Sequence, residues 1–198
     1  MEDGGIMKKT QLRGQLFELR SSSHWLRETE KIAAHLTAFF KDNPVEVLAL
    51  YWPIRSEIDL RACAVGLKAQ GLVDELAMPA IVDNRMQFVR WSPGEVMERD
   101  SAGIPMPKSG HPVSPDCILV PCVGLTANGQ RLGYGAGWYD RTLNEYPQAL
   151  TIGVLAQAFM VKNISAQSHD VALNAYVTEE GIFPCRELPA SWHFASSK

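Results

Sequence analysis

Two apolar runs, residues 45–51 and 117–123, constrain the fold of this chain more than any other feature. The second run contains no charged residue and the first contains one. Neither shows the alternation of apolar and polar residues that is typical of a strand with one face in water. Strands that are buried on both faces belong to the interior of a parallel sheet covered by helices. The sequence therefore predicts an α/β protein.

Segments with helical periodicity alternate with the apolar runs along the chain. Leu12, Leu16 and Leu19, for example, recur at helical spacing. We expect helices at 8–20, 25–40, 58–70 and 139–145, strands at 45–51, 78–82, 86–91, 117–123, 150–155 and 175–178, and an extended loop over 92–115. This order predicts a three-layer α/β fold with a mostly parallel sheet and flanking helices. Ligands of such folds bind beyond the carboxyl ends of the strands.

Length and charge set further limits. A chain of 198 residues, 46% of them hydrophobic and 21% charged, suits one domain over 1–198, with a flexible leader at 1–6 and a tail at 190–198. The net charge of −3 disfavours a nucleic-acid-binding protein, which usually carries an excess of basic residues. We therefore expect any polyanionic ligand to be held by a local cluster of cations.

The cysteine pattern and the lack of a recognisable signal peptide or membrane-spanning stretch indicate a cellular location. Cys63, Cys117, Cys122 and Cys185 show no C-x-x-C spacing, so buried thiols are favoured over a metal site. No disulfide framework, signal peptide or membrane-spanning stretch is recognisable. We expect a cytoplasmic protein without a membrane or an obligate protein partner.

The segment 131–141, R-L-G-Y-G-A-G-W-Y-D-R, carries the clearest chemical signal. Gly133, Gly135 and Gly137 are a poor choice for a strand or helix, but they permit positive φ and a close approach of the backbone to a ligand. Successive N–H groups can then turn toward an anion, and Arg131 adds a planar cation. This pattern predicts a phosphate-binding loop for a nucleotide.

Two common phosphate motifs do not fit, and one alternative stays open. The dinucleotide fingerprint needs G-x-G-x-x-G directly after a strand, and the P-loop needs G-x-x-x-x-G-K-[ST]; the chain contains neither. The alternative is a flexible glycine-rich linker. The aromatic and charged residues between the glycines disfavour it.

Beyond these properties, the segment resembles a known signature. The run Ile118 to Pro121, followed by G-Q-R-L-G-Y-G-A-G-W-Y-D-R at 129–141, is similar to that of the 5-formyltetrahydrofolate cyclo-ligase family. Weaker landmarks follow the family order: Lys9 with Leu12 and Arg13, the segment 51–59, Gln157, His169 with Asp170, and 177–179. The resemblance spans about residues 8–180.

The resemblance implies a fold and a reaction. Family members have a sheet similar to that of the ribose-phosphate isomerase and coenzyme A transferase group. They convert 5-formyltetrahydrofolate to 5,10-methenyltetrahydrofolate and use ATP and Mg²⁺. The γ-phosphoryl group goes to the formyl oxygen, N10 closes on the carbon, and phosphate leaves. Catalysis then depends on positioning and charge neutralisation.

The resemblance also implies site residues. Those for ATP are Lys9, Arg13, Arg131, Gly133, Tyr134, Gly135, Ala136, Gly137, Trp138 and Tyr139. Those for the reduced folate are Trp52, Glu57, Tyr134, Gly135, Ala136, Gly137 and Trp138, with Glu57 accepting hydrogen bonds from the pterin. Asp140 and Asp170 would hold Mg²⁺, which takes carboxylate oxygens beside nucleotide phosphates.

Each assignment has a structural alternative. Lys9 and Arg13 also fit a solvated basic helix face, and Asp140 also fits an acid that stabilises the first turn of a helix. Trp52, Tyr134 and Trp138 also fit simple packing. The chain departs from the family pattern at Trp138, where tyrosine is usual, and at Leu60 and 121–126.

Two other functions remain open at this point. The chain could be an ATP-binding enzyme of the same family that acts on another formyl- or amide-bearing metabolite. It could also be a non-catalytic module that binds a nucleotide or a folate. Fold resemblance by itself does not fix the substrate.

Overall fold

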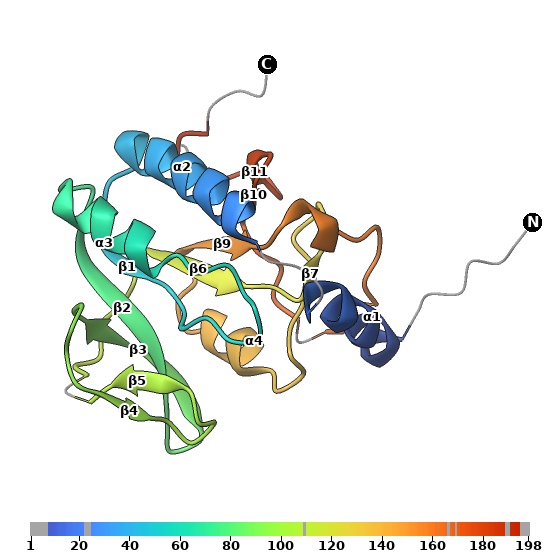
Figure 1. Cartoon of the computed structure of the whole chain (residues 1–198), viewed down its shortest axis with the longest axis horizontal. Helices are drawn as coiled ribbons and strands as arrows, with labels where there is room; N and C mark the ends of the chain where they lie inside the picture. Colours follow the sequence, from blue (N-terminus) through green and yellow to red (C-terminus); the bar gives the residue numbers. More distant parts are fainter. Residues whose placement is uncertain are drawn as a thin grey trace, which may run out of the picture.

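The computed structural model describes residues 8–21, 25–108, 110–165, 167–168, 170–188 and 191–194 (Figure 1). The expected leader at 1–6 lies outside these residues. The described helices are α1 (Lys9–Ser21), α2 (Leu26–Asp42), α3 (Arg61–Ala69) and α4 (Trp138–Leu143), with a 3-10 helix, η1 (Gln157–Phe159). None of them is both long enough and apolar enough to cross a membrane.

One seven-stranded sheet forms the centre of the described molecule, in the order β11-β10-β9-β6-β1-β2-β3. Its strands are β1 (Val45–Ala49), β2 (Val73–Val82), β3 (Arg85–Trp91), β6 (Cys117–Pro121), β9 (Leu150–Val154), β10 (Ala175–Thr178) and β11 (Gly181–Pro184). The five inner strands are parallel, and β3 and β11 are antiparallel edges. The predicted α/β fold with a mostly parallel sheet is confirmed.

Helices pack on both faces of this sheet, which gives three layers. On one face, Leu36 and Phe40 of α2 and Leu67 of α3 share a hydrophobic cluster with β1, β2, β6 and β9. On the other face, Leu16 of α1 and Leu143 of α4 share a second cluster with β2, β3 and β6. Every residue of β6 and of β9 is buried. Burial from both sides explains why the central strands read as uninterrupted apolar runs.

Strand β2 and its hairpin differ from the expectation. The expected start at residue 78 is wrong, because β2 begins at Val73 and its first half pairs with β1. In the sequence, the charged residues Asp74 and Glu75 interrupt the apolar pattern of this first half, so it is not recognisable as a strand. The turn to β3 is tight, with Asp83 at φ 49° and Asn84 at φ 60°. Asp and Asn tolerate this left-handed conformation better than most residues, so the expected joint at 83–84 is confirmed.

Short strands appear where the sequence predicted only loops. The stretch 92–115 contains a hairpin of β4 (Met97–Arg99) and β5 (Pro105–Pro107), and β7 (Gly124–Leu125) pairs with β8 (Arg131–Leu132), which begins the glycine segment 131–141. Pro105 and Pro107 cannot donate to a ladder, which is tolerated in a two-stranded edge such as this one. Proline and short length together hide such strands from periodicity arguments.

The expected tail at 190–198 is described only at 191–194, and that part packs against α2. Phe39 of α2 stacks on Trp192 at 6.2 Å between ring centroids and contacts Phe194. Asn43 closes the arrangement with two hydrogen bonds to the backbone of His193, of 2.7 and 2.8 Å. These residues therefore extend the hydrophobic layer over α2.

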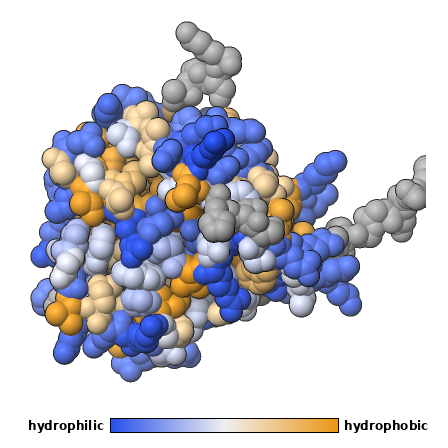
Figure 2. Space-filling model, in the orientation of Figure 1, coloured by the Kyte–Doolittle hydropathy of each residue, from blue (hydrophilic) through white to orange (hydrophobic). Residues whose placement is uncertain are grey.

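On the face shown in Figure 2, hydrophilic and hydrophobic residues are interspersed.

Candidate active site

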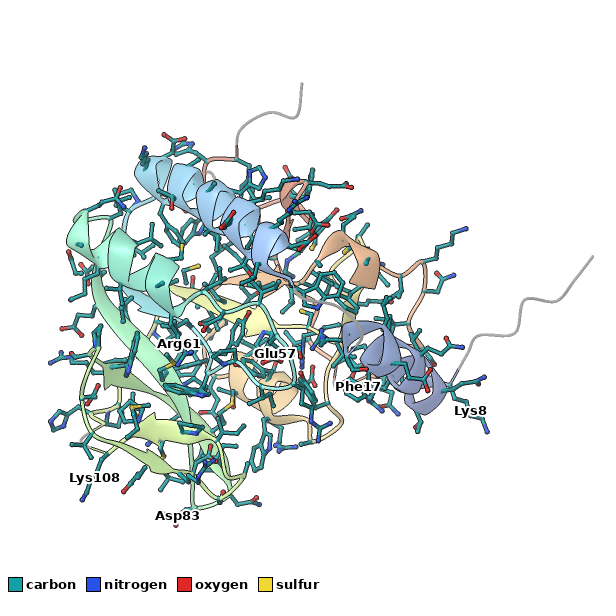
Figure 3. The ribbon with its side chains drawn as sticks, viewed as in Figure 1. Lys8, Phe17, Glu57, Arg61, Asp83 and Lys108 are labelled. Carbon is teal, nitrogen blue, oxygen red and sulfur yellow. The ribbon has the colours of Figure 1, made fainter. Side chains whose placement is uncertain are left out.

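A cavity of about 310 Å³ lies where α1, the segment after β1 and the glycine segment meet. Every residue that the sequence predicted for the site lines it: Lys9, Arg13, Trp52, Glu57, Arg131, Gly133, Tyr134, Gly135, Ala136, Gly137, Trp138, Tyr139, Asp140 and Asp170. In Figure 3, Glu57 lies near the centre of the molecule, between the sheet and α1, which carries Phe17. The structure thus brings together segments that are up to 161 residues apart.

The three glycines of the loop are required for different reasons. Gly135 and Gly137 have φ of 102° and 69°, in the left-handed region that favours glycine. Gly133 lacks positive φ, but an added Cβ would lie 2.5 Å from the Arg131 guanidinium. Gly137 also precedes the first residue of α4. The loop is therefore shaped both by backbone conformation and by the space that Arg131 needs.

Arg131 is a buried cation in the wall of the cavity. Its side chain is only 5% exposed, and its Nη2 lies 3.0 Å from Oδ2 of Asp140, in the first turn of α4. The guanidinium also lies 5.4 Å from the ring centroid of Tyr139. Its Nε is buried and has no hydrogen-bond partner among the described residues. A buried donor without a partner is costly, so this atom is suited to a ligand oxygen.

Helix α1 brings two more cations to the same cavity. Lys9 Nζ lies 2.6 Å from Oδ2 of Asp170, and both side chains are largely buried. Arg13 Nε donates a 2.7 Å hydrogen bond to the carbonyl of Gly133. Because Lys9 and Arg13 are four residues apart, they lie on one helix face. A purely solvated basic face, the alternative considered from the sequence, does not describe these contacts.

Glu57 is a partly buried carboxylate held from two sides. Tyr134 Oη donates a 2.7 Å hydrogen bond to Oε1, and the Ile54 N–H donates a 2.9 Å bond to Oε2. Burial raises the pKa of the Glu57 carboxyl above its usual range, although these two hydrogen bonds and the charges of Arg20 and Arg55 act in the opposite direction. A carboxylate in this environment gains from further hydrogen-bond donors.

Trp52 and Trp138 each carry an arginine on one face. The Arg61 guanidinium lies 4.2 Å from the ring centroid of Trp52, and that of Arg141 lies 4.7 Å from Trp138. Both tryptophans line the cavity. Each tryptophan ring therefore packs against an arginine and also forms part of the cavity wall.

The two carboxylates expected for a metal are both in the cavity wall, each paired with a cation. No group of three or more His, Cys, Asp or Glu side chains with metal-binding geometry occurs among the described residues. One or two carboxylates completed by phosphate oxygens and water are a usual Mg²⁺ environment, and Asp140 and Asp170 fit that donor set. His169 lies outside the described residues.

The sequence did not predict the apolar part of the cavity wall. Pro79 and Ile81 of β2, Met86 of β3, and Ala102 and Ile104 between β4 and β5 line it. None belongs to a chemical motif, and the 92–115 stretch was expected to be only a crossing loop. The sequence contains one weak indication of this wall: Pro79 and Ile81 are two residues apart in β2, so their side chains lie on the same face of the sheet.

Arg20 is a second omission. It is 4% exposed in the last turn of α1, next to Tyr134 and Glu57 but outside the wall of the main cavity. In the sequence it reads as one more basic residue of an amphipathic helix. A buried arginine cannot be distinguished from an exposed one without knowing which face of the helix is covered.

Several known proteins resemble this chain in sequence. The profile of the 5-formyltetrahydrofolate cyclo-ligase family matches residues 6–179. The 5-formyltetrahydrofolate cyclo-ligases of Haemophilus influenzae and Mycoplasma pneumoniae are each 26% identical over 179 residues, covering 84% and 88% of this chain and 95% and 100% of their own.

A solved structure gives the same result at the level of the fold. The NMR structure of Aquifex aeolicus 5,10-methenyltetrahydrofolate synthetase has a TM-score of 0.77 and 27% identity, and the match covers 97% of this chain and 100% of that chain. The family match includes α1, the segment around Glu57 and the entire glycine segment. On this evidence the chain belongs to the 5-formyltetrahydrofolate cyclo-ligase family.

Proposed function

We propose that this chain converts 5-formyltetrahydrofolate to 5,10-methenyltetrahydrofolate, while ATP becomes ADP and phosphate. One observation carries the proposal: a single cavity has four cations and a glycine loop in its wall, together with the partly buried carboxylate of Glu57. The cations suit a polyphosphate, and the carboxylate suits a nitrogen-rich ring that donates hydrogen bonds. Both substrates can then meet in one space.

The phosphates of ATP would bind along the glycine loop. Arg131, whose Nε has no hydrogen-bond partner among the described residues, begins this loop, and Arg13 of α1 donates a hydrogen bond to the carbonyl of Gly133 within it. Lys9 is next to them in the cavity wall. Backbone N–H groups of a loop with positive φ at Gly135 and Gly137 add further donors. Together these groups neutralise the charge that phosphoryl transfer redistributes.

Asp140 and Asp170 are the carboxylates that we propose for Mg²⁺. The Asp140 carboxylate engages Arg131 through Oδ2. Within the described chain no hydrogen bond reaches its Oδ1, which leaves an oxygen for a metal or for its water shell. Mg²⁺ bound with ATP supplies charge neutralisation and orientation of the γ-phosphoryl group.

The folate would bind with its pterin on Glu57. An ionised carboxylate accepts two hydrogen bonds from an amino-pyrimidinone edge, which fixes the ring in the cavity. The apolar wall of Ile81, Met86 and Ile104 offers a surface for the remaining rings. The formyl oxygen then lies where it can accept the γ-phosphoryl group.

Ring closure follows from that orientation. Transfer of the γ-phosphoryl group forms a new P–O bond at the formyl oxygen and releases ADP. N10 adds to the formyl carbon and loses its proton, and the C–O bond breaks with phosphate as the leaving group. The protein supplies position, charge and exclusion of water, and no nucleophile of its own.

A reducing compartment such as the cytoplasm suits this chain. Its four cysteines, Cys63, Cys117, Cys122 and Cys185, are all free thiols. Cysteines of secreted proteins are usually paired.

The decisive experiment mixes the purified chain with ATP, Mg²⁺ and (6S)-5-formyltetrahydrofolate and follows the absorbance of methenyltetrahydrofolate. We expect product only when all three are present, in a ratio of one ADP per ring closed. ATP binding without product formation would contradict the proposed substrate. In that case other formyl- or amide-bearing metabolites become the substrates to test.

A further inference from the structure

Arg20 makes contacts that a surface anchor would not need. Its Nη1 donates a 3.0 Å hydrogen bond to the hydroxyl of Tyr134, and its Nη2 donates a 2.6 Å bond to the carbonyl of Cys122. Its guanidinium lies 4.8 Å from the ring centroid of Phe159. A second, very small cavity of about 10 Å³ is lined by both Arg20 and Glu57.

The Tyr134 hydroxyl connects Arg20 to Glu57 in a defined direction. An arginine side chain has no acceptor, so the hydroxyl oxygen must accept from Arg20. Its proton is then available for Glu57, whose Oε1 lies 2.7 Å away. The Tyr134 ring is held by Phe17, stacked at 5.5 Å, and by the Arg55 guanidinium at 5.6 Å. The chain of donors runs from Arg20 through Tyr134 to Glu57.

Charge balance also favours this connection. A buried guanidinium is costly unless its charge is compensated. Within the described residues Arg20 forms no ion pair within 4 Å, so its compensation comes through the hydroxyl and from the field of Glu57. Glu57 in turn has no directly bonded cation among the described residues. Each charge therefore depends on the other through Tyr134.

We infer that Arg20 is a positioning residue for Glu57, acting through the Tyr134 hydroxyl to keep the carboxylate ionised and aimed into the main cavity. This inference rests on the proposed function for the role of Glu57 as the pterin acceptor. Arg20 touches neither substrate, since it lies outside the wall of the main cavity. It acts from the end of the same helix that carries Lys9 and Arg13.

The electrostatic consequence has a definite sign. The groups that face Glu57 from the surrounding elements are Arg20, Tyr51, Arg55, Cys122, Tyr134 and Tyr139. Arg20 and Arg55 lower the pKa of the Glu57 carboxyl, against the larger effect of burial, and Arg20 has the greater influence. Replacing Arg20 by an uncharged residue must therefore raise that pKa further.

A titration without substrate tests the inference directly. The carboxyl carbon of Glu57 is followed by NMR against pH in the ¹³C-glutamate-labelled full chain, with Glu57→Gln to assign the signal. In Arg20→Met the Glu57 titration should move to higher pH, and in Arg20→Lys it should stay closer to the wild type. An unchanged titration in a folded Arg20→Met protein would overturn the inference. Because no folate is needed, this test does not depend on the proposed reaction.

Kinetics then show whether Arg20 acts through Tyr134. We expect Arg20→Met and Tyr134→Phe each to lower kcat/KM for the folate about tenfold, a loss typical of one hydrogen bond near a charge. The acid limb of the pH profile should move to higher pH in both. The double variant should lose little more than either single variant, because both cut the same connection. A loss of about a hundredfold in the double variant would mean independent roles and would refute the connection.

Tyr134→Phe also covers the case in which Arg20→Met does not fold. It removes the hydroxyl but leaves the Arg20 bond to the Cys122 carbonyl in place. If the Glu57 titration stays unchanged in this variant, the inference fails. If instead the wild-type protein closes no ring while the Glu57 titration moves to higher pH in Arg20→Met, the proposed function fails and the positioning role of Arg20 stands.

Discussion

Asp140 combines two roles that single-residue reasoning would separate. It occupies the first turn of α4, where an acid is favourable, and it pairs with the buried guanidinium of Arg131. Either role would keep an acid at this position without any metal. A substitution therefore has to separate the loss of charge at the nucleotide from the loss of a structural pair.

Asp140→Asn makes that separation, because asparagine can still accept a hydrogen bond from Arg131. If Asp140 helps to hold Mg²⁺, the rate of ring closure should fall more than a hundredfold, which corresponds to about 3 kcal/mol in the barrier. The Mg²⁺ concentration needed for half the maximal rate should also rise. The measurement is the rate against Mg²⁺ at saturating ATP.

The matched control is Asp59→Asn. Asp59 also pairs with an arginine, Arg61 at 2.6 Å, but this pair does not involve the glycine loop. We expect this control to keep the wild-type dependence on Mg²⁺. Superimposable curves for Asp140→Asn and the wild type would assign Asp140 to helix stabilisation alone.

The raised pKa of Glu57 implies that this residue lowers stability while it serves function, to an extent that depends on pH. Its pKa is raised in the folded protein, mainly by burial. A group with a raised folded pKa contributes stability below its unfolded pKa, and that contribution is lost as the pH rises through the folded value. At neutral pH, ionised Glu57 therefore destabilises the fold relative to a neutral side chain of the same shape.

Glu57→Gln should accordingly raise Tm at pH 7 to 8 while it lowers affinity for the folate. The gain in Tm should shrink as the pH falls through the raised pKa of Glu57 toward the ordinary range of a glutamate carboxyl, because the wild-type carboxyl is then neutral as well. Thermal melts across this range give the measurement, with the exposed Glu98→Gln as control. A Tm difference that is independent of pH would contradict the burial of an ionised Glu57.

At the scale of elements, the glycine loop is the part that the sequence predicted most fully. Alternating glycines indicated positive φ and an anion, and two of the three have positive φ. The exception, Gly133, is explained by a neighbour two residues away, Arg131, whose guanidinium folds back over it. No periodicity or composition argument reports where a side chain folds back.

Gly135→Ala tests the loop as a ligand-binding element. An added Cβ would lie no closer than 3.6 Å to Arg13, so the loss would come from the backbone conformation and the ligand space, and not from a clash. We expect ATP affinity to fall at least tenfold, with a loss of about 1 kcal/mol in the free energy of unfolding. Isothermal titration with an ATP analogue and chemical denaturation give the two values.

Gly94→Ala is the control for backbone strain. Gly94 has φ of 84° and open space around its Cβ position, but it lies in the turn before β4. This variant should lose a similar amount of stability and bind ATP as the wild type does. If both variants bind ATP equally well, the glycine loop does not contact the phosphates.

At the scale of the whole molecule, the parallel sheet was predictable because its inner strands are buried on both faces. The strand order was not, since β1 lies between β6 and β2 by virtue of crossover connections that no local pattern records. The candidate residues were found through the glycine segment and the family resemblance. Arg20 and the apolar wall were missed because their place in the site depends on how α1 and the β4–β5 hairpin pack.

Helix α1 is the element through which the whole site is joined. Of its residues only Leu16 and Arg20 are buried, yet its side chains reach Asp170, Gly133 and the Tyr134 hydroxyl. Helix α2, by contrast, buries Ile32, Leu36, Phe39 and Phe40 in the core. Elements with little buried apolar surface open locally at a lower free energy than the core does. The attachment of α1 should therefore depend on the ligand that its cations bind.

We predict that hydrogen exchange of the α1 amides slows when a non-hydrolysable ATP analogue and Mg²⁺ are added, while that of α2 does not change. A ligand at 100 times its Kd stabilises the state that binds it by about 2.7 kcal/mol, so protection of α1 can rise up to about a hundredfold. Arg13→Gln, which weakens the proposed phosphate contact, should reduce this gain. Equal protection of α1 with and without the nucleotide would show that the helix is held by its packing alone and that Lys9 and Arg13 do not bind ATP. Slower exchange in α1 and α2 together would instead indicate global stabilisation, and it would separate the binding of ATP from any particular role of this helix.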